Sequence, residues 1–182
     1  VRMIRKSGIV FDKVEIEAAD VPFGIGSGSG VIFGVTGGVT EAVLRRLQQG
    51  HNRVDMESIK KSGVRGDDGI KVLTYNYNGR EIKAAVVNGL ANADKVLQQI
   101  KNHEAEYDFV EVMACRRGCI MGGGQPVNAG PRTRKARMKG LYDTDINTQI
   151  KKSNENPMIL SLYDTLLKGK EHELLHRNFS GK

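Results

Sequence analysis

Three short runs rich in β-branched and aromatic residues predict β-strands. Two of them, 70–77 (IKVLTYNY) and 80–87 (REIKAAVV), flank Asn78-Gly79, a dipeptide typical of a two-residue hairpin turn. The third run, 107–113 (YDFVEVM), stands alone and leads directly into the two cysteines of the chain. The pattern therefore predicts a hairpin and a separate third strand.

Apolar residues spaced three and four apart predict helices around these strands. In 39–50 the expected buried stripe is Val39, Ala42, Val43 and Leu47, and Gly50 suits the position that ends a helix. In 93–103 the residues expected to face inward are Val96, Leu97 and Ile100. Further helical patterns cover part of 52–70, the chain beyond Pro131, residues 158–167 after Asn156-Pro157, and 171–179 at the end.

Strands that alternate with helices, with glycine-rich loops where strands end, predict an α/β layer fold. Ligands of open α/β sheets bind beyond the carboxyl ends of the strands. The cysteine-bearing loop after 107–113 is expected at such an edge. The glycine-rich segment 23–38 is a second candidate for a position at this edge.

The net charge of +7 changes this picture little, because 28 basic residues are interspersed with 21 acidic ones. Only 131–139 (PRTRKARMK) is densely basic, and no nucleic-acid signature accompanies it. We interpret this basic cluster as a solvated helix face or as a docking patch for an acidic protein, and we expect no nucleic-acid partner. The chain has no apolar run long enough to cross a membrane and no signal-peptide pattern, so we expect a cytoplasmic protein without a membrane partner.

The glycine-rich segment 23–38 contains seven glycines in sixteen residues. It does not satisfy the G-x-G-x-x-G spacing of dinucleotide-binding loops, and it lacks the Lys-Ser/Thr pair of a P-loop. Two readings remain open: a tightly turning or flexible loop, and a place where the backbone must approach a cofactor closely, since glycine has no Cβ to prevent it.

The segment 172–176 (HELLH) matches the H-E-x-x-H pattern of zinc proteases. Such a site needs a third ligand, usually downstream, and the last six residues contain no His, Asp, Glu or Cys. A terminal helix with Leu174 and Leu175 packed inward is the favoured reading.

Cys115 and Cys119 are the only cysteines of the chain, and three glycines follow at 122–124. A disulfide is disfavoured by the expected compartment, a C-x3-C-x2-C cluster motif would need cysteine where Gly122 stands, and zinc would need two more ligands. Two unrelated buried thiols remain an alternative. A glycine-rich turn suits an iron–sulfur cluster, because backbone N–H groups can face the sulfurs. A cubane needs four ligands, so two would come from elsewhere.

The stretch 111–126 (EVMACRRGCIMGGGQP) closely resembles the third H-cluster signature of the [FeFe]-hydrogenases, E-x-M-A-C-x-x-G-C-x-x-G-G-G-Q-P. Residues 28–45, 139–145, 151–157 and the HELLH tail also resemble that family, and the last match removes the protease reading. The resemblance implies the second α/β lobe of a two-lobed fold, a sheet flanked by helices, over 1–130. It implies a basic segment and C-terminal helices packed on that lobe over 131–182.

The resemblance further implies an oxidoreductase that reversibly combines two protons and two electrons into dihydrogen at an H-cluster. This cofactor is a [4Fe–4S] cubane joined to a diiron subcluster. Cys115 would ligate the cubane, and Cys119 would ligate it and also bridge to the diiron unit. Met113 would lie against the diiron unit, and Phe33 and Gly34 would help to line its pocket.

Two departures from the family pattern matter. The signatures T-S-C-C-P-x-W and M-P-C-x-x-K-x-x-E are absent, so we expect that an N-terminal lobe of the same polypeptide has been removed and that this part is inactive alone. Arg116-Arg117 replace the small or histidine-glycine residues that are more usual between the cysteines, and two cations should raise a cluster's reduction potential. The expected electron partner is a ferredoxin or a nicotinamide-linked subunit. The alternative function is that of a superfamily member carrying only a [4Fe–4S] cluster, with an assembly or sensory role.

Overall fold

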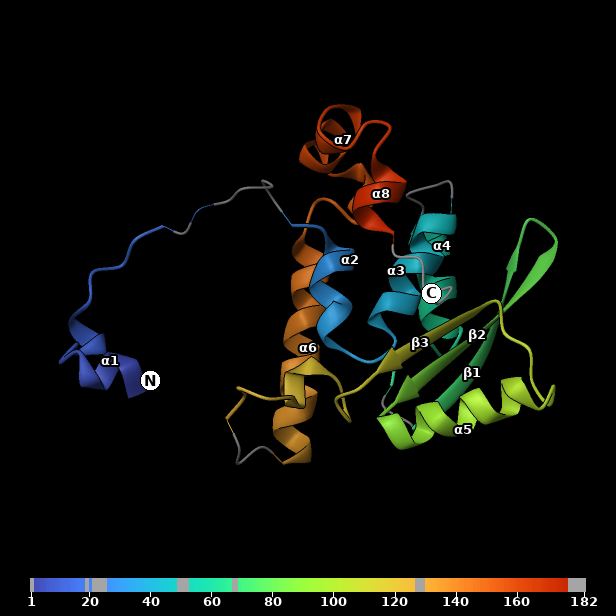
Figure 1. Cartoon of the computed structure of the whole chain (residues 1–182), viewed down its shortest axis with the longest axis horizontal. Helices are drawn as coiled ribbons and strands as arrows, with labels where there is room; N and C mark the ends of the chain where they lie inside the picture. The colour runs from blue at the N-terminus through green and yellow to red at the C-terminus, as the bar shows by residue number, and fades with distance from the viewer. Residues whose placement is uncertain are drawn as a thin grey trace.

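The computed structural model describes residues 2–18, 20, 26–48, 53–66, 69–126 and 130–176. A three-stranded sheet with the order β1-β2-β3 lies between helices (Figure 1). The predicted α/β class is therefore confirmed. Within the described ranges, no helix is long and apolar enough to cross a membrane.

The hairpin lies where the pattern predicted it. Strands β1 (Ile70–Tyr77) and β2 (Arg80–Asn88) pair antiparallel. The two turn residues have left-handed backbone angles, with φ of 51° at Asn78 and 79° at Gly79. These are the angles that a type I′ turn requires, which explains why Asn-Gly stands there.

The third strand pairs with the same central strand in the other direction. The chain leaves β2, forms helix α5 (Leu90–Lys101) and returns as β3 (Phe109–Met113), parallel to β2. The last residues of the two strands, Asn88 and Met113, are partners in the register. The carboxyl ends of both strands therefore meet at one edge of the sheet, and the cysteine loop begins at that edge as predicted.

Strand β2 is buried on both faces because helices cover both sides of the sheet (Figure 1). Ala84 and Val86 pack with Leu44 and Ile59 from helices α3 (Gly38–Leu47) and α4 (Arg53–Lys61). The alternate residues of β2, Ala85 and Val87, pack with residues of α5. The alternation of strand side chains thus divides the core into two layers.

The predicted buried stripe of α3 is wrong. Val39, Ala42, Val43 and Leu47 are only half-buried, and the buried residues are Thr40, Glu41, Leu44 and Arg45. Charged residues face the interior because buried partners neutralise them, an arrangement that apolar periodicity does not reveal. The helix ends at Leu47, and Gly50 lies outside the described residues.

The prediction for α5 is correct only in part. Val96 is buried, as expected, together with Ala93, whereas Leu97 is 61% exposed and Ile100 is 37% exposed. A single sheet face accepts one narrow stripe of this helix, so its second apolar row remains on the surface.

Three buried charged residues, Glu41, Arg45 and Asp145, form one network with the partly buried Arg65. The Arg45 guanidinium donates to both carboxylate oxygens of Asp145 at 2.7 Å and to Glu41 at 2.6 Å. Arg65 donates to the same Glu41 carboxylate at 2.7 and 2.8 Å. Burial opposes the charge of Arg45, but these hydrogen bonds and the nearby carboxylates raise its pKa. Asp145 lies on α6 (Pro131–Asn147), so the network joins α6 to α3.

Tyr142 borders this network on α6. The Arg65 guanidinium carbon lies 3.9 Å from the centre of the Tyr142 ring, a cation–π contact. Burial raises the pKa of Tyr142 to about 12, against the opposing effect of the Arg65 charge. The phenol therefore stays neutral throughout the physiological range.

The described part of the glycine-rich segment, residues 26–38, is a tight turn with helical content. It contains helix α2 (Gly28–Val31) and the 3-10 helix η2 (Ile32–Gly34). A Cβ on Gly28 would lie 2.1 Å from Asp145 Oδ1, and a Cβ on Gly38 would lie 1.8 Å from the Ile32 carbonyl oxygen. Gly28 and Gly38 are therefore needed for close approach within the fold.

The segment that follows α6 is hydrogen-bonded to α2. The backbone N–H groups of Gly28 and Ser29 donate to the carbonyl oxygens of Ile150 and Lys151, at 2.8 and 3.1 Å. The chain then forms the 3-10 helix η4 (Ser153–Glu155), α7 (Pro157–Asp164) and α8 (Glu171–Leu175). Asn156 caps α7 by accepting from the Met158 N–H, so the predicted start of this helix is confirmed.

The end of α7 and the interior of α8 differ from the prediction. Helix α7 stops at Asp164, short of residue 167, and α8 stops at Leu175. Leu174 and Leu175 are 58% and 50% exposed, so the expectation that they pack inward is wrong. A helix of five residues is too short to bury a stripe on its own.

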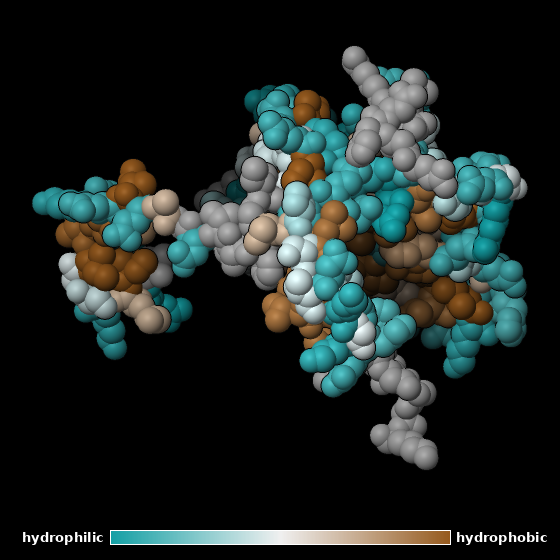
Figure 2. All heavy atoms as spheres, turned by 90° about the horizontal axis from the view of Figure 1, so that it is seen from above, coloured by the Kyte–Doolittle hydropathy of each residue, from teal (hydrophilic) through white to brown (hydrophobic). Residues whose placement is uncertain are grey.

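The N-terminal segment stands apart from the body of the molecule (Figure 1). It forms helix α1 (Arg2–Lys6) and the 3-10 helix η1 (Phe11–Lys13). Its large apolar side chains are exposed, and Figure 2 shows them gathered as a brown cluster separate from the rest.

Replacing Asp145 by Ala is expected to lower the free energy of unfolding by about 3–5 kcal/mol, because it leaves the fully buried Arg45 without its bidentate partner. The matched control is Asp143→Ala on the same helix, whose carboxylate pairs with exposed Lys139. This control should change stability by no more than about 0.5 kcal/mol. Denaturant unfolding of both variants measures the difference, and equal losses would contradict the role of the network.

Candidate functional site

The two cysteines lie on one loop at the carboxyl edge of the sheet. After β3 the chain turns at Gly118, whose N–H donates to the Cys115 carbonyl oxygen at 3.0 Å, and Cys119 begins the 3-10 helix η3 (Cys119–Met121). Both cysteines are free thiols with exposed side chains. The alternative of two buried structural thiols is therefore wrong.

The loop leaves room for a group bound to the thiols. A Cβ on Gly122 would lie 3.3 Å from Cys115 Sγ, whereas Cβ atoms on Gly123 and Gly124 would meet nothing within 4 Å. Two exposed thiols on an open, glycine-lined loop fit half of the ligand set of a [4Fe–4S] cubane. Among the residues that the structure describes, no group of three or more His, Cys, Asp and Glu could hold a metal ion.

Two more of the predicted site residues, Gly34 and Met113, lie next to Gly118 of this loop. A Cβ at Gly118 would lie 2.9 Å from the Gly34 carbonyl oxygen and 3.2 Å from Met113 Sδ. The glycine, with φ of 81°, therefore allows the glycine-rich turn, the end of β3 and the cysteine loop to meet. Gly34 and Met113 both belong to the neighbourhood of the thiols.

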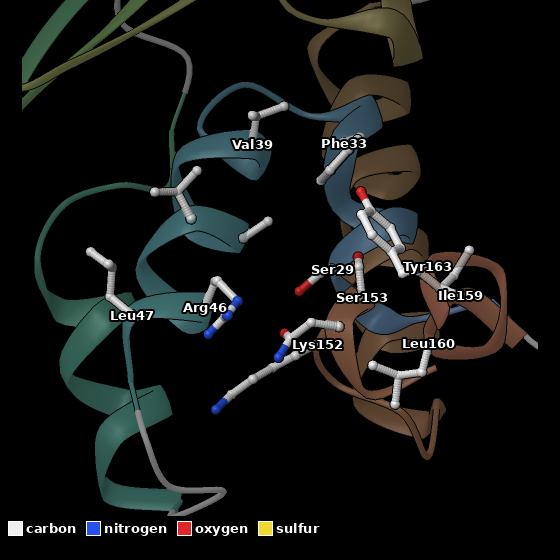
Figure 3. Close-up of a pocket in the computed structure, with 13 residues that line it drawn as sticks. Ser29, Phe33, Val39, Arg46, Leu47, Lys152, Ser153, Ile159, Leu160 and Tyr163 are labelled. Carbon is white, nitrogen blue, oxygen red and sulfur yellow. The ribbon is translucent and has the colours of Figure 1, made fainter. Parts of the chain in front are cut away.

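Phe33 has a different setting. Its side chain is 44% exposed and borders a mostly apolar groove of about 680 Å³ between α3 and α7 (Figure 3). The half-buried residues of the predicted α3 stripe, including Val39 and Leu47, line the other side. Phe33 therefore lines this groove, whereas the next residue, Gly34, lies beside Gly118 of the cysteine loop.

Glu111 is the organising residue that reasoning from the sequence did not assign. Its carboxylate is buried and accepts the Gly37 N–H at 2.8 Å, the Thr40 N–H at 2.7 Å and the Thr40 hydroxyl at 2.7 Å. Gly37 is the residue that caps the N-terminus of α3, where a negative charge is favourable. The signal was present in the sequence, because Glu111 is the first fixed letter of the cysteine signature.

The two arginines between the cysteines are exposed. Arg117 has φ of 77°, in the left-handed region that favours glycine. Glycine would adopt this conformation freely, whereas arginine at this position carries backbone strain.

The histidines of the HELLH segment lie near each other at the end of α8. The ring centres of His172 and His176 are 4.5 Å apart, and the rings meet edge to face. This pair is remote in sequence from the cysteine loop.

Comparisons with known proteins agree with this arrangement. Residues 1–123 match the family described as iron only hydrogenase large subunit, C-terminal domain, and residues 131–182 match the family described as iron hydrogenase small subunit. The chain belongs to the iron-only hydrogenase family. The family predicted from the cysteine signature is therefore confirmed.

Iron hydrogenase 1 of Clostridium pasteurianum is 37% identical over 185 residues, which cover 96% of this chain and 32% of that protein. NADP-reducing hydrogenase subunit HndD of Solidesulfovibrio fructosivorans is 36% identical over 183 residues, 98% of this chain and 31% of that protein. This member of the iron-only hydrogenase family thus spans about a third of the length of these curated relatives.

Solved structures of the family have the same fold. The structure described as HydA(deltaEFG), from a study of stepwise H-cluster assembly, matches with a TM-score of 0.61 and 32% identity. The match covers 97% of this chain and 53% of the other. A variant of [FeFe]-hydrogenase HydA1 from Chlamydomonas reinhardtii matches with a TM-score of 0.62 and 33% identity, over 97% of this chain and 52% of the other.

Replacing Glu111 by Ala is expected to cost about 3 kcal/mol in the free energy of unfolding, because two buried N–H groups and a hydroxyl lose a charged acceptor. Glu104→Ala removes an exposed carboxylate and serves as the control, with a change within about 0.5 kcal/mol. Chemical denaturation measures both. A loss in Glu111→Ala no larger than in the control would show that the carboxylate does not hold the helix.

Replacing Arg117 by Gly is expected to stabilise the chain by about 1 kcal/mol, because glycine adopts the left-handed conformation without a Cβ clash. Arg116→Gly is the matched control, since Arg116 has no positive φ and glycine there only adds freedom to the unfolded chain. Thermal unfolding should rank the Arg117 variant above the parent and the Arg116 variant below it. The reverse order would contradict the strain at Arg117.

Proposed function

We propose that this chain forms one half of the cluster-binding site of an [FeFe]-hydrogenase. The observation that carries the proposal is the pair of exposed thiols, Cys115 and Cys119, on an open glycine loop at the carboxyl edge of the sheet. Membership of the iron-only hydrogenase family supports this assignment, because the matched family model and the similar curated protein are both described as iron hydrogenases.

In this proposal Cys115 ligates the [4Fe–4S] cubane, and Cys119 ligates the cubane and bridges to the diiron subcluster. Met113, Phe33 and Gly34 belong to the wall of the cofactor site. When bound, the H-cluster supplies the chemistry that reversibly converts protons and electrons into dihydrogen. The residues of this chain would hold it and fix the loop beside it.

The chain contributes two cysteines, and a cubane takes four ligands, so the other two would come from an N-terminal lobe of the same polypeptide. We therefore propose that the chain alone is inactive. We also propose a division into a second α/β lobe over 1–130 and a C-terminal segment over 131–182, which the two matched ranges support. The electron partner is a ferredoxin or a nicotinamide-linked subunit, and the name of the NADP-reducing relative supports the second kind.

A second candidate function is that of an iron–sulfur protein that carries only a [4Fe–4S] cluster. Cytosolic Fe-S cluster assembly factor narfl of Xenopus tropicalis is 26% identical over 175 residues, 93% of this chain and 36% of that protein. The higher identity of the hydrogenases, together with every fixed letter of the cysteine signature, favours the first candidate.

The test is infrared spectroscopy of the intact protein that contains this chain and its companion lobe, matured anaerobically. Stretching bands of iron-bound CO and cyanide are expected in the parent. They should be absent in Cys119→Ala, because the bridge to the diiron unit is lost, and retained in Met121→Leu, which changes a side chain of the same loop.

Iron and sulfide analysis distinguishes the two candidates. A protein with iron and sulfide but no CO or cyanide bands would be a cubane carrier, and the hydrogenase proposal would fail. Bands that persist in Cys119→Ala would leave the family in place but remove Cys119 as the bridge.

A further inference from the structure

One buried hydroxyl lies at the junction of all the segments that form the site. Thr36 belongs to the glycine-rich segment and is 2% exposed. Its Oγ1 donates to Asn88 Oδ1 at 2.9 Å and lies 3.7 Å from Met113 Sδ, within hydrogen-bonding reach of the sulfur. Asn88 and Met113 are the last residues of β2 and β3 and are register partners. Thr36 therefore contacts the carboxyl ends of both strands.

The two acceptors of Thr36 differ in strength. A hydroxyl has one proton, an amide oxygen is a strong acceptor and a thioether sulfur is a weak one. Asn88 is 1% exposed, so its amide lies in a fixed, dry environment. The hydroxyl proton therefore goes chiefly to Asn88, which orients the hydroxyl, and the Thr36 oxygen lies in contact with the Met113 sulfur.

A contact of this kind can select one conformation of the Met113 side chain. Methionine is unbranched and has three rotatable side-chain bonds, so packing alone specifies it poorly. On the side of the cysteine loop, a Cβ at Gly118 would lie 3.2 Å from Met113 Sδ and 3.4 Å from the Thr36 backbone nitrogen. The sulfur is thus confined between the Thr36 hydroxyl and the backbone of the cysteine loop.

We propose that Thr36, oriented by Asn88, is a positioning residue that fixes the Met113 thioether beside the cysteine loop. This inference rests on the proposed function, which assigns Met113 to the wall of the cofactor site. Through Met113, the Asn88–Thr36 bond would set the distance and orientation of the sulfur relative to the group that Cys115 and Cys119 hold.

The first test uses the chain itself, labelled with ¹³C in its methionine methyl groups. The chain has six methionines, and Met113→Leu identifies the resonance of Met113. Thr36→Val keeps the shape of the side chain and removes the hydroxyl, whereas Thr36→Ser keeps the hydroxyl. We expect the Met113 resonance to shift in Thr36→Val and to keep its parent position in Thr36→Ser, with the exposed Met3 unchanged in both.

Three results would overturn the proposal: an unmoved Met113 resonance in Thr36→Val, an equal shift in both variants, or a common shift of all methionines, which indicates a structural role only. The unaltered chain provides a check that does not depend on folding of a variant. It should show a nuclear Overhauser effect between the Thr36 side chain and the groups that flank the Met113 sulfur. Its absence would also overturn the proposal.

The second test uses the matured intact protein and separates this inference from the proposed function. The CO and cyanide bands should shift in Thr36→Val at unchanged iron content and return to the parent positions in Thr36→Ser. Bands present in the parent but unmoved in Thr36→Val would overturn the link to the cofactor. Absence of bands in the parent itself would overturn the proposed function, whereas the methionine resonances would still decide the positioning of Met113.

Discussion

The buried carboxylate of Glu111 is the constraint on which the site depends. It lies on the last strand, two residues before Met113, and accepts three hydrogen bonds from the start of α3. A charged acceptor at a helix N-terminus satisfies N–H groups that the helix leaves free and interacts favourably with its dipole. One side chain thereby fixes the glycine-rich turn before α3 relative to the strand that leads to the cysteines.

Asp145 on α6 contacts the other end of the same turn, at Gly28. This carboxylate pairs with Arg45 of α3 and also fills the space beside Gly28, where no Cβ could stand. Two buried acids, one from the sheet and one from the C-terminal helices, therefore confine a segment that contains seven glycines. Glycine allows the close approach, and the charged hydrogen bonds supply the rigidity that glycine lacks.

This rigidity explains how an open site can still be well defined. The two thiols are exposed, but the Gly118 backbone beside them packs against Gly34 and Met113. The loop is thus anchored on its inner side and free on its outer side. In the proposed function this arrangement suits a ligand held jointly with a second lobe, because the anchored loop would keep its geometry before that lobe binds.

The elements that sequence predicted correctly are those decided by local chemistry. Asn78-Gly79 specifies a hairpin turn by its backbone angles, and Asn156-Pro157 specifies a helix start by a cap and a fixed φ. The cysteine signature named the family because its letters are contiguous. The inward face of α3 was not predictable in this way, since Glu41 and Arg45 become suitable for burial only when Asp145, about a hundred residues later, lies beside them.

Local patterns along the chain were therefore enough to predict the strands, most of the helices, the family and the two candidate ligands. Tertiary structure alone decided which faces are buried, that Glu111 and Asp145 confine the glycine-rich turn, and that Thr36 meets Met113. The physical reason is that a buried polar group is tolerated only with its partner in place, and those partners come together only when distant segments pack.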